Sequence, residues 1–187
     1  MPEHDAVDPP TLSDGVVTLR AWSADDVPVL PGLIDGDEEI VRWLDMMPSP
    51  YTEQDAREWI ERAAAGWRSG AFAPFAIVAD GAVAGGLGFN TIDRESGAGE
   101  IGYWLTRAAR GRGLTTRALL LAARWGFDGL GLERIQLRAE VRNLASCRVA
   151  EKAGFTREGV LRSARYNPRQ DRRLDFALYS LLPGELD

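Results

Sequence analysis

The chain has 187 residues, enough for one compact domain whose core needs no disulfides or structural metal. Its hydrophobic content of 45% and charged content of 27% are typical of globular proteins, and its net charge of −6 argues against a general nucleic-acid binder. Cys147 is the only cysteine and His4 the only histidine. These counts argue against a disulfide framework, a zinc site and a histidine-based triad, so we expect no metal.

Targeting and membrane signals are not evident in the sequence. No apolar run reaches transmembrane length, and Met1–Pro10 lacks the pattern of a signal peptide. We therefore expect a cytoplasmic protein with neither a membrane nor a nucleic acid as a direct partner. We also expect residues 1–15, rich in Pro and Asp, to form a flexible arm, and residues 16–187 to form a single domain.

Hydrophobic periodicity predicts about seven strands and about four helices. The first strand is Val16–Trp22, and Ser23 is predicted to cap a short helix that ends near Leu33, although Pro28 and Pro31 interrupt its pattern. The other predicted strands are Ala73–Ala79, Ala82–Ile92, Glu100–Leu105, Arg134–Val141, Phe155–Leu161 and Leu174–Leu182. The other predicted helices are a short piece within Asp35–Leu44, then Thr52–Gly70, a helix from Leu114, and Asn143–Ala153. A helix between two strands favours a parallel pair, so this order predicts an α+β (α/β) fold with a mixed sheet.

The most informative stretch joins the strand Glu100–Leu105 to a helix through a turn of glycines and arginines. Gly111 and Gly113 permit close backbone approach, and the first N–H groups of the helix can point at an anion. Arg110 and Arg112 can add charge-assisted hydrogen bonds. Taken alone, the turn is equally compatible with a solvated surface segment. Neither the P-loop pattern nor the dinucleotide-binding pattern is present, so the turn by itself does not identify the anion.

Four blocks of sequence together carry a family resemblance. They are Glu100–Leu105 (EIGYWL), Arg110–Thr115 (RGRGLT), Asn143–Ser146 (NLAS) and Glu151–Phe155 (EKAGF). In order and spacing the chain resembles the GNAT N-acetyltransferase superfamily, and within it the RimJ/RimL-like branch that acetylates protein N-termini. The resemblance runs from Val16 to Leu182. It implies the GNAT fold, a mostly antiparallel seven-stranded sheet whose central parallel pair splays apart.

The resemblance implies acetyl-CoA as co-substrate. Thr115 stands where the family usually has Gly or Ala, but its backbone N–H is still available for phosphate. Asn143 is expected to contact the pantetheine amides, or to act simply as a helix N-cap, and both roles are compatible. The residues implied to bind the cofactor are Trp104, Leu105, Thr106, Arg110, Gly111, Arg112, Gly113, Leu114, Thr115, Asn143 and Lys152.

Two residues are implied in catalysis, which is attack of a neutral amine on an acyl thioester. Glu100 matches the family's carboxylate position and is the candidate base, acting directly or through water; its alternative is a solvated strand-edge carboxylate. Ser146 is the candidate acid, by hydrogen bonding to the leaving sulfur. Nothing in the sequence activates Cys147 as a nucleophile, so we expect it to be a buried helix residue.

The acceptor is far less specified. We expect its site between Asp35–Tyr51 and a basic loop, Ser163–Arg173, whose arginines either favour an acidic peptide or form a solvated face. A protein or peptide N-terminal α-amine is the leading acceptor, since its low pKa demands only a modest base. A small amine, such as an antibiotic, amino acid or polyamine, shares every cofactor feature. A CoA-binding sensor or RNA-associated protein without turnover is the third reading. Acyl groups other than acetyl, such as succinyl, and a homodimer both stay open.

Overall fold

The computed structural model describes residues 8–186, so His4 and the first half of the predicted arm lie outside the described residues. One sheet of eight strands, in the order β1-β2-β3-β4-β5-β6-β8-β7, organises the domain. All neighbouring strands are antiparallel except β5 and β6, which confirms the mixed, mostly antiparallel GNAT sheet. The strands are β1 (Leu12–Ser13), β2 (Thr18–Ala21), β3 (Ala73–Ala79), β4 (Ala82–Asp93), β5 (Ala98–Leu105), β6 (Arg134–Glu140), β7 (Thr156–Asn167) and β8 (Arg172–Leu181).

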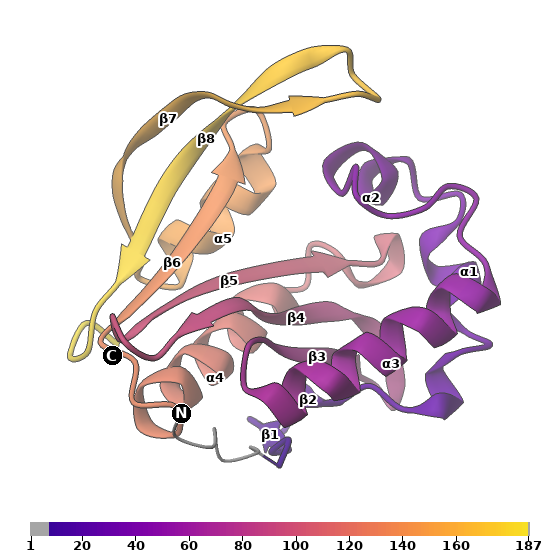
Figure 1. Cartoon of the computed structure of the whole chain (residues 1–187), viewed down its shortest axis with the longest axis horizontal. Helices are drawn as coiled ribbons and strands as arrows, with labels where there is room; N and C mark the ends of the chain where they lie inside the picture. The colour runs from indigo at the N-terminus through magenta and orange to yellow at the C-terminus, as the bar shows by residue number, and fades with distance from the viewer. Residues whose placement is uncertain (1–7, 187) are drawn as a thin grey trace.

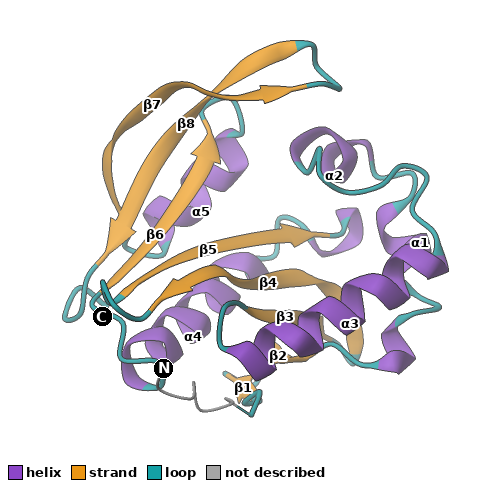
Figure 2. Cartoon of the chain, in the orientation of Figure 1, coloured by secondary structure: helices purple, strands orange, loops and turns teal. Residues whose placement is uncertain are grey.

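The sheet has two wings that diverge from a common edge (Figure 1). Strands β1 to β5 form one wing, and β6, β8 and β7 form the other. Helices α3 and α4 cover opposite faces of the first wing, while α5 lies against β6 and β7 (Figure 2). The described helices are α1 (Leu30–Ile34), α2 (Glu38–Trp43), α3 (Glu53–Ser69), α4 (Leu114–Asp128) and α5 (Leu144–Lys152), with 3-10 turns at η1 (Ala24–Asp26) and η2 (Arg107–Ala109).

The main core lies between the first wing and α4. Trp125 of α4 packs against Trp67, Phe75 and Phe89 with ring centroids 5.4–6.0 Å apart. Tilted and edge-to-face contacts of this kind add to the burial of the rings themselves. A second, smaller core lies on the α3 face and includes Trp22. Trp67 of α3 and Trp125 of α4 therefore serve as core residues.

Two segments differ from the sequence prediction. The helix expected from Ser23 to Leu33 is instead a 3-10 turn followed by the separate helix α1. Proline explains the break, because Pro28 lacks an N–H for a continuous helix and Pro31 is tolerated only in the first turn of α1.

The second difference is the basic segment Ser163–Arg173, which was predicted to be a loop. Strand β7 continues to Asn167 and pairs with β8 after a shift in register, so only a short turn separates the two strands. Polar side chains suit this edge strand, whose described residues are almost all exposed.

The predicted arm is partly ordered. Leu12 and Ser13 add an eighth strand to the predicted seven by pairing with β2. Asp14 fixes this end of the chain, since its Oδ1 accepts the Val16 and Val17 N–H groups at 2.9 and 2.8 Å and its Oδ2 lies 2.8 Å from Arg117 Nη1. Burial raises the pKa of Asp14, but these N–H groups and the Arg117 guanidinium outweigh it and lower the pKa to about 2.

We predict that Asp14→Asn lowers the free energy of unfolding near pH 7, because the carboxylate loses its contact with Arg117. The loss is only about 1 kcal/mol, since solvent screens this partly exposed pair. The folded pKa is depressed, so the stabilisation is present above the unfolded value of about 3.9 and is lost as pH falls towards about 2. Urea unfolding from about pH 7 to about pH 2 tests this, with exposed Asp8→Asn as the control. A difference between Asp14→Asn and wild type that does not change with pH would contradict it.

Candidate active site

Strands β5 and β6 separate soon after they meet. They pair in parallel only between Ala98–Glu100 and Arg134–Gln136. Beyond Glu100, β5 continues to Leu105 with β4 as its strand partner, and β6 continues with β8. The edge of β5 that faces β6 thus leaves backbone groups available from residue 101 onward. This separation is the splayed pair that the resemblance implies.

A cavity of about 520 Å³ opens beside the far end of β5, and we call it the helix-end cavity. It is bordered by β5, the glycine–arginine turn, the start of α4 and the start of α5. Gly113 occupies the N-cap of α4 with φ 74°, and it supplies no side-chain cap. The first N–H groups of a helix have no partner within the helix, so this end of α4 presents donors and a positive dipole to an anion.

Most of the predicted cofactor residues line this cavity. They are Trp104, Leu105, Arg110, Gly111, Gly113, Leu114, Thr115, Asn143 and Lys152. Two others do not: Thr106 is buried, with its N–H donating to Ala84 O at 2.9 Å, and Arg112 pairs at the surface with Asp80 at 2.6 Å. Arg142 and Arg148 also line the cavity, although the sequence did not single them out. Neither belongs to the glycine-rich turn. Arg142 precedes α5 and Arg148 lies within it, and only this position in the fold places them at the cavity.

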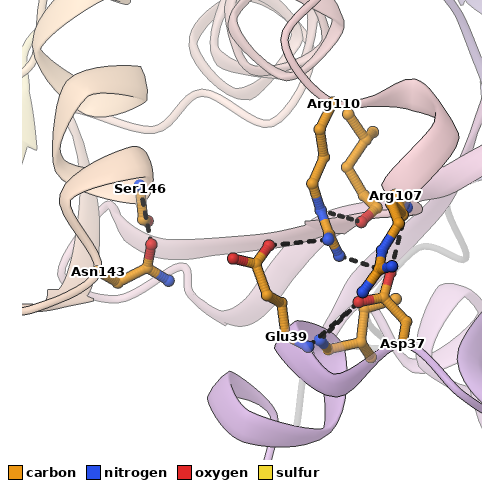
Figure 3. Close-up of polar contacts among 8 residues, drawn as sticks. Asp37, Glu39, Arg107, Arg110, Asn143 and Ser146 are labelled. Carbon is orange, nitrogen blue, oxygen red and sulfur yellow. Dashed lines mark hydrogen bonds and ion pairs between the residues drawn. The ribbon is translucent and has the colours of Figure 1, made fainter.

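Arg110 is committed to a network inside the protein (Figure 3). Its Nη2 lies 2.7 Å from Asp37 Oδ2, its Nη1 2.8 Å from Glu39 Oε2, and its Nε donates to Leu105 O at 3.1 Å. Asp37 is the N-cap of α2 and also accepts the Arg107 N–H at 3.1 Å. Arg110 therefore fastens α2 to the end of β5, a role that the motif alone does not reveal.

Ser146 and Asn143 stand on the opposite side of the opening, at the start of α5 (Figure 3). Asn143 Oδ1 accepts the Ser146 N–H at 3.1 Å, so the predicted N-cap is present. Tyr103 reaches across from β5, with its hydroxyl 2.9 Å from Ser146 Oγ and 3.1 Å from Ser146 O. Burial raises the pKa of Tyr103, so its hydroxyl stays protonated and can donate. The sequence treats Tyr103 only as an alternating strand residue, yet its hydroxyl connects β5 to the start of α5 across the opening.

Glu100 lies apart from these groups. It is placed where β5 and β6 are still paired, and it lines neither cavity described in this section. Its carboxylate is 2.7 Å from Arg138 Nη2 and accepts a hydrogen bond from Gln136 Nε2 at 3.3 Å. Alternation along β5 puts Glu100 on the same sheet face as Gly102 and Trp104. The structure therefore does not bring the two predicted catalytic residues into contact.

A second cavity, of about 420 Å³, lies on the α3 face of the sheet, and we call it the aromatic cavity. Trp43, Leu44, Tyr103 and Trp104 line both cavities, so the two meet at the end of β5. The aromatic cavity is bordered by Tyr51 and Arg165, which places it between the two segments predicted to hold the acceptor.

The arginines of the β7–β8 hairpin make contacts within the chain. Arg165 pairs with Asp45 at 2.7 Å, and Arg169 donates to Val41 O at 2.9 Å and to Met47 O. Arg173 donates to Ser163 O through Nε at 2.9 Å. The contacts of Arg165 and Arg169 attach the hairpin to α2 and to the segment that follows it, whereas that of Arg173 lies within the hairpin.

Comparison with known proteins decides the family. Residues 17–156 match the acetyltransferase (GNAT) domain. This chain belongs to the GNAT acetyltransferase family. It is 32% identical to the uncharacterized N-acetyltransferase p20 of Bacillus licheniformis, over 94% of this chain and 97% of that protein. It is 29% identical to the ribosomal-protein-serine acetyltransferase of Escherichia coli, over 62% of this chain and 64% of that protein.

A solved structure supports the same assignment and the cofactor. The chain superposes with a TM-score of 0.81 and 25% identity on the microcin C7 self-immunity acetyltransferase MccE, which was solved with acetyl-CoA and AMP. The match covers 90% of this chain and 93% of that one. The family and the helix-end cavity agree, so the chain is an acetyl-CoA-dependent N-acetyltransferase. Over residues 8–186, no helix is both long enough and apolar enough to span a membrane.

We predict that Asp37→Asn lowers the free energy of unfolding by about 2 kcal/mol, because it removes one partner of a mostly buried ion pair. Burial raises the pKa of Asp37, but the Arg110 guanidinium and the Ile40 N–H outweigh it and hold the pKa below its usual value. The stabilisation is thus present above the unfolded pKa of about 3.9 and fades as pH falls below it.

Denaturant titrations of the two proteins from about pH 7 to about pH 3 measure this effect. Glu39→Gln is the matched control, because Glu39 is the exposed partner of the same arginine and should cost under about 0.5 kcal/mol. Equal losses of unfolding free energy in the two variants would show that the buried Asp37–Arg110 contact stabilises the fold no more than the exposed Glu39–Arg110 contact.

Proposed function

We propose that the acceptor is the N-terminal α-amine of a protein or peptide, acetylated by direct attack in a ternary complex. The observation that carries direct attack is the junction of the two cavities at Tyr103 and Trp104, where an amine and a thioester can meet. The choice of a protein amine is supported by the similarity to the Escherichia coli ribosomal-protein-serine acetyltransferase. An α-amine is also the easier nucleophile, since its pKa is about 7.7–8.0, whereas that of lysine is about 10.4.

In the proposed acetyl transfer, the amine nitrogen attacks the thioester carbonyl carbon, a C–N bond forms, and the C–S bond breaks. Starting from an ammonium group, one proton leaves before attack and one as the amide forms. One proton ends on the coenzyme A sulfur and the other in solvent. Backbone N–H groups on the open edge of β5 would stabilise the developing oxyanion, and the helix-end cavity would hold the cofactor.

Ser146 is proposed to hydrogen-bond the leaving sulfur. A serine hydroxyl is a weak acid, so its contribution depends on placement. The hydroxyl of Tyr103 holds Ser146 Oγ at 2.9 Å, which makes Tyr103 the group that orients it. Either hydroxyl can donate in that contact. When Tyr103 donates to Ser146 Oγ, the Ser146 hydrogen is free to donate to the coenzyme A sulfur.

Glu100 is proposed as the base, acting through water. It shares a sheet face with Gly102, which lines the aromatic cavity two residues along β5, about 7 Å away. That spacing is too long for direct proton transfer from an amine in the cavity and suits an intervening water. Arg138 keeps the carboxylate in place.

A small amine is the second candidate acceptor, because an aromatic-lined cavity of about 420 Å³ is the size of small-molecule sites. A CoA-binding sensor would share the helix-end cavity but release no coenzyme A. The acyl group, the cytoplasmic location and a homodimer stay predictions from the sequence.

We predict that Ser146→Ala lowers kcat by about tenfold to a hundredfold and changes the KM for acetyl-CoA by less than about threefold. A lost hydrogen bond to the sulfur affects the transition state more than the bound thioester. Steady-state release of the free thiol measures this. Tyr103→Phe is the companion variant, and it should reproduce part of the loss because Ser146 Oγ loses its partner. Full kcat in both variants would exclude this role.

We predict that Glu100→Gln lowers kcat by about a hundredfold or more near neutral pH, because water then lacks its acceptor. A lower kcat that recovers as pH rises towards the pKa of the amine is the signature of a missing base. Arg138→Gln is the control, since it removes the ion pair but keeps the carboxylate. If both variants lose the same activity at every pH, Glu100 is structural.

The proposed acceptor is tested by mass spectrometry of a mixed panel. Peptides with free N-termini, the same peptides with blocked N-termini but a free lysine, and small primary amines are each incubated with acetyl-CoA and enzyme. Acetylation of free N-termini alone supports the proposal. Acetylation of small amines alone supports the second candidate, and coenzyme A binding without any product supports the sensor.

A further inference from the structure

A third cavity, of about 420 Å³, is lined by three arginines, and we call it the arginine pocket. Its lining residues are Arg42, Trp43, Arg142, Gln170 and Arg172, so no carboxylate lines it. The cations come from three separate elements, since Arg42 belongs to α2, Arg142 to the link between β6 and α5, and Arg172 to the start of β8. The tip of the β7–β8 hairpin lies beside α2, and Gln170 Nε2 donates to Arg42 O at 3.1 Å (Figure 1).

Two of the three guanidinium groups are available to a ligand. Arg42 and Arg142 are exposed, and neither guanidinium has an ion-pair or hydrogen-bond partner among residues 8–186. The Arg42 guanidinium lies over the Trp43 ring, with its Cζ 5.5 Å from the centroid. Stacking of this kind occupies the face of the guanidinium and leaves the N–H groups at its edge able to donate. Both side chains therefore offer charge and donors to an anion.

Arg172 is held more firmly than the other two. Its Nε and Nη2 donate to Gln170 Oε1 at 3.0 and 2.7 Å, and its Nη2 lies 3.5 Å from Glu140 Oε1. Glu140 is buried and does not line the pocket. This carboxylate offsets one of the three positive charges, so the arginine pocket keeps an excess of positive charge.

The arginine pocket adjoins the place where the proposed reaction occurs. Trp43 lines the arginine pocket, the helix-end cavity and the aromatic cavity, and Arg142 lines the first two. An acceptor whose amine lies at the junction of the two larger cavities thus has a cationic region beside it. An extended peptide advances about 3.3–3.6 Å per residue, so the pocket is within reach of the side chains that soon follow the amine.

We propose, resting on the proposed function, that the arginine pocket binds a carboxylate of the acceptor, carried within about four residues of the acetylated amine. The substrate class is then an N-terminus that is followed closely by Asp or Glu, or, among small amines, one that also carries a carboxylate. Guanidinium groups donate paired, charge-assisted hydrogen bonds to a carboxylate, which selects it over a neutral amide of the same shape.

Acceptor charge is tested with C-terminally amidated peptides that have a free N-terminus. A single Asp is moved from the second to the fifth position, and each peptide is compared by kcat/KM with the same peptide carrying Asn. We expect Asp to exceed Asn by about tenfold or more at one or two positions, and the advantage to shrink in high salt because exposed charges are screened. A ratio near one at every position overturns the proposal.

Arg42→Gln is the test variant, because Arg42 is exposed and its loss leaves no buried carboxylate without a partner. We expect the ratio of Asp to Asn to fall below about threefold, and Arg42→Glu to favour a Lys peptide over the Asp peptide. Arg68→Gln is the matched control, since Arg68 is an exposed residue of α3 that lines none of the three cavities. An equal fall in Arg68→Gln would assign the preference to net charge and overturn the proposal. Thermal unfolding confirms that each variant is folded.

The cofactor is the other source of an anion, because Arg142 also lines the helix-end cavity. If the pocket serves the acceptor, Arg42→Gln changes the KM for acetyl-CoA by less than about twofold. If the pocket holds a phosphate of the cofactor instead, that KM rises by about tenfold while the ratio of Asp to Asn stays as in the wild type. This second outcome overturns the proposal.

The two proposals fail in different ways. If peptides are acetylated without regard to Asp, the proposed function stands and the inference falls. If small amines are acetylated and peptides are not, the proposed protein acceptor is wrong, and 4-aminobutyrate compared with 4-aminobutanamide decides the pocket by the same ratio. If no amine is acetylated, calorimetry of the Asp and Asn peptides with enzyme loaded with coenzyme A, in the wild type and in Arg42→Gln, decides it by binding alone.

Discussion

The separation of β5 from β6 is the constraint on which the rest of the site depends. A ladder of three residue pairs joins them, whereas β6 pairs with β8 over six residues and β5 pairs with β4 along its whole length. Beyond this ladder β5 and β6 diverge, and each continues with its other neighbour alone (Figure 1). The end of β5, the start of α4 and the start of α5 all border the helix-end cavity beside this opening.

Polar contacts hold the elements around the opening in place. Asp37 and Arg110 fasten α2 to the end of β5, and α2 supplies Trp43 to both cavities. On the other side, Tyr103 joins β5 to Ser146 of α5. The cavity walls thus come from helices whose positions are set by a few charge-assisted or buried hydrogen bonds, which are stronger than exposed ones.

The glycines of β4 show how one residue type can serve both packing and function. Their spacing predicts a bulge or a close backbone approach, and the structure shows both. The pairing of β4 with β3 shifts in register beside Gly85, and a Cβ at Gly88 would lie 2.6 Å from Ala73 O of β3. What the spacing does not show is that Gly86 and Gly88 face the same side as Gly102. A Cβ at any of the three would clash with a neighbour at 2.6 Å, so the absent side chains let the surrounding groups pack closely on the sheet.

The sequence by itself predicted most of the elements and most of the residues that line the helix-end cavity. The alternation of Glu100–Leu105, the helix start at Leu114 and the cap at Asn143 are local patterns, and local sterics and hydrogen bonding fix them wherever the chain goes. The tertiary structure decided the partners of the long polar side chains. Arg110 has Asp37 as its partner, 73 residues away, and Arg165 has Asp45, 120 residues away. Sequence spacing contains no information about such contacts, because they arise only when the sheet brings distant segments together. The aromatic cavity is the clearest case, since its lining residues come from many separate elements.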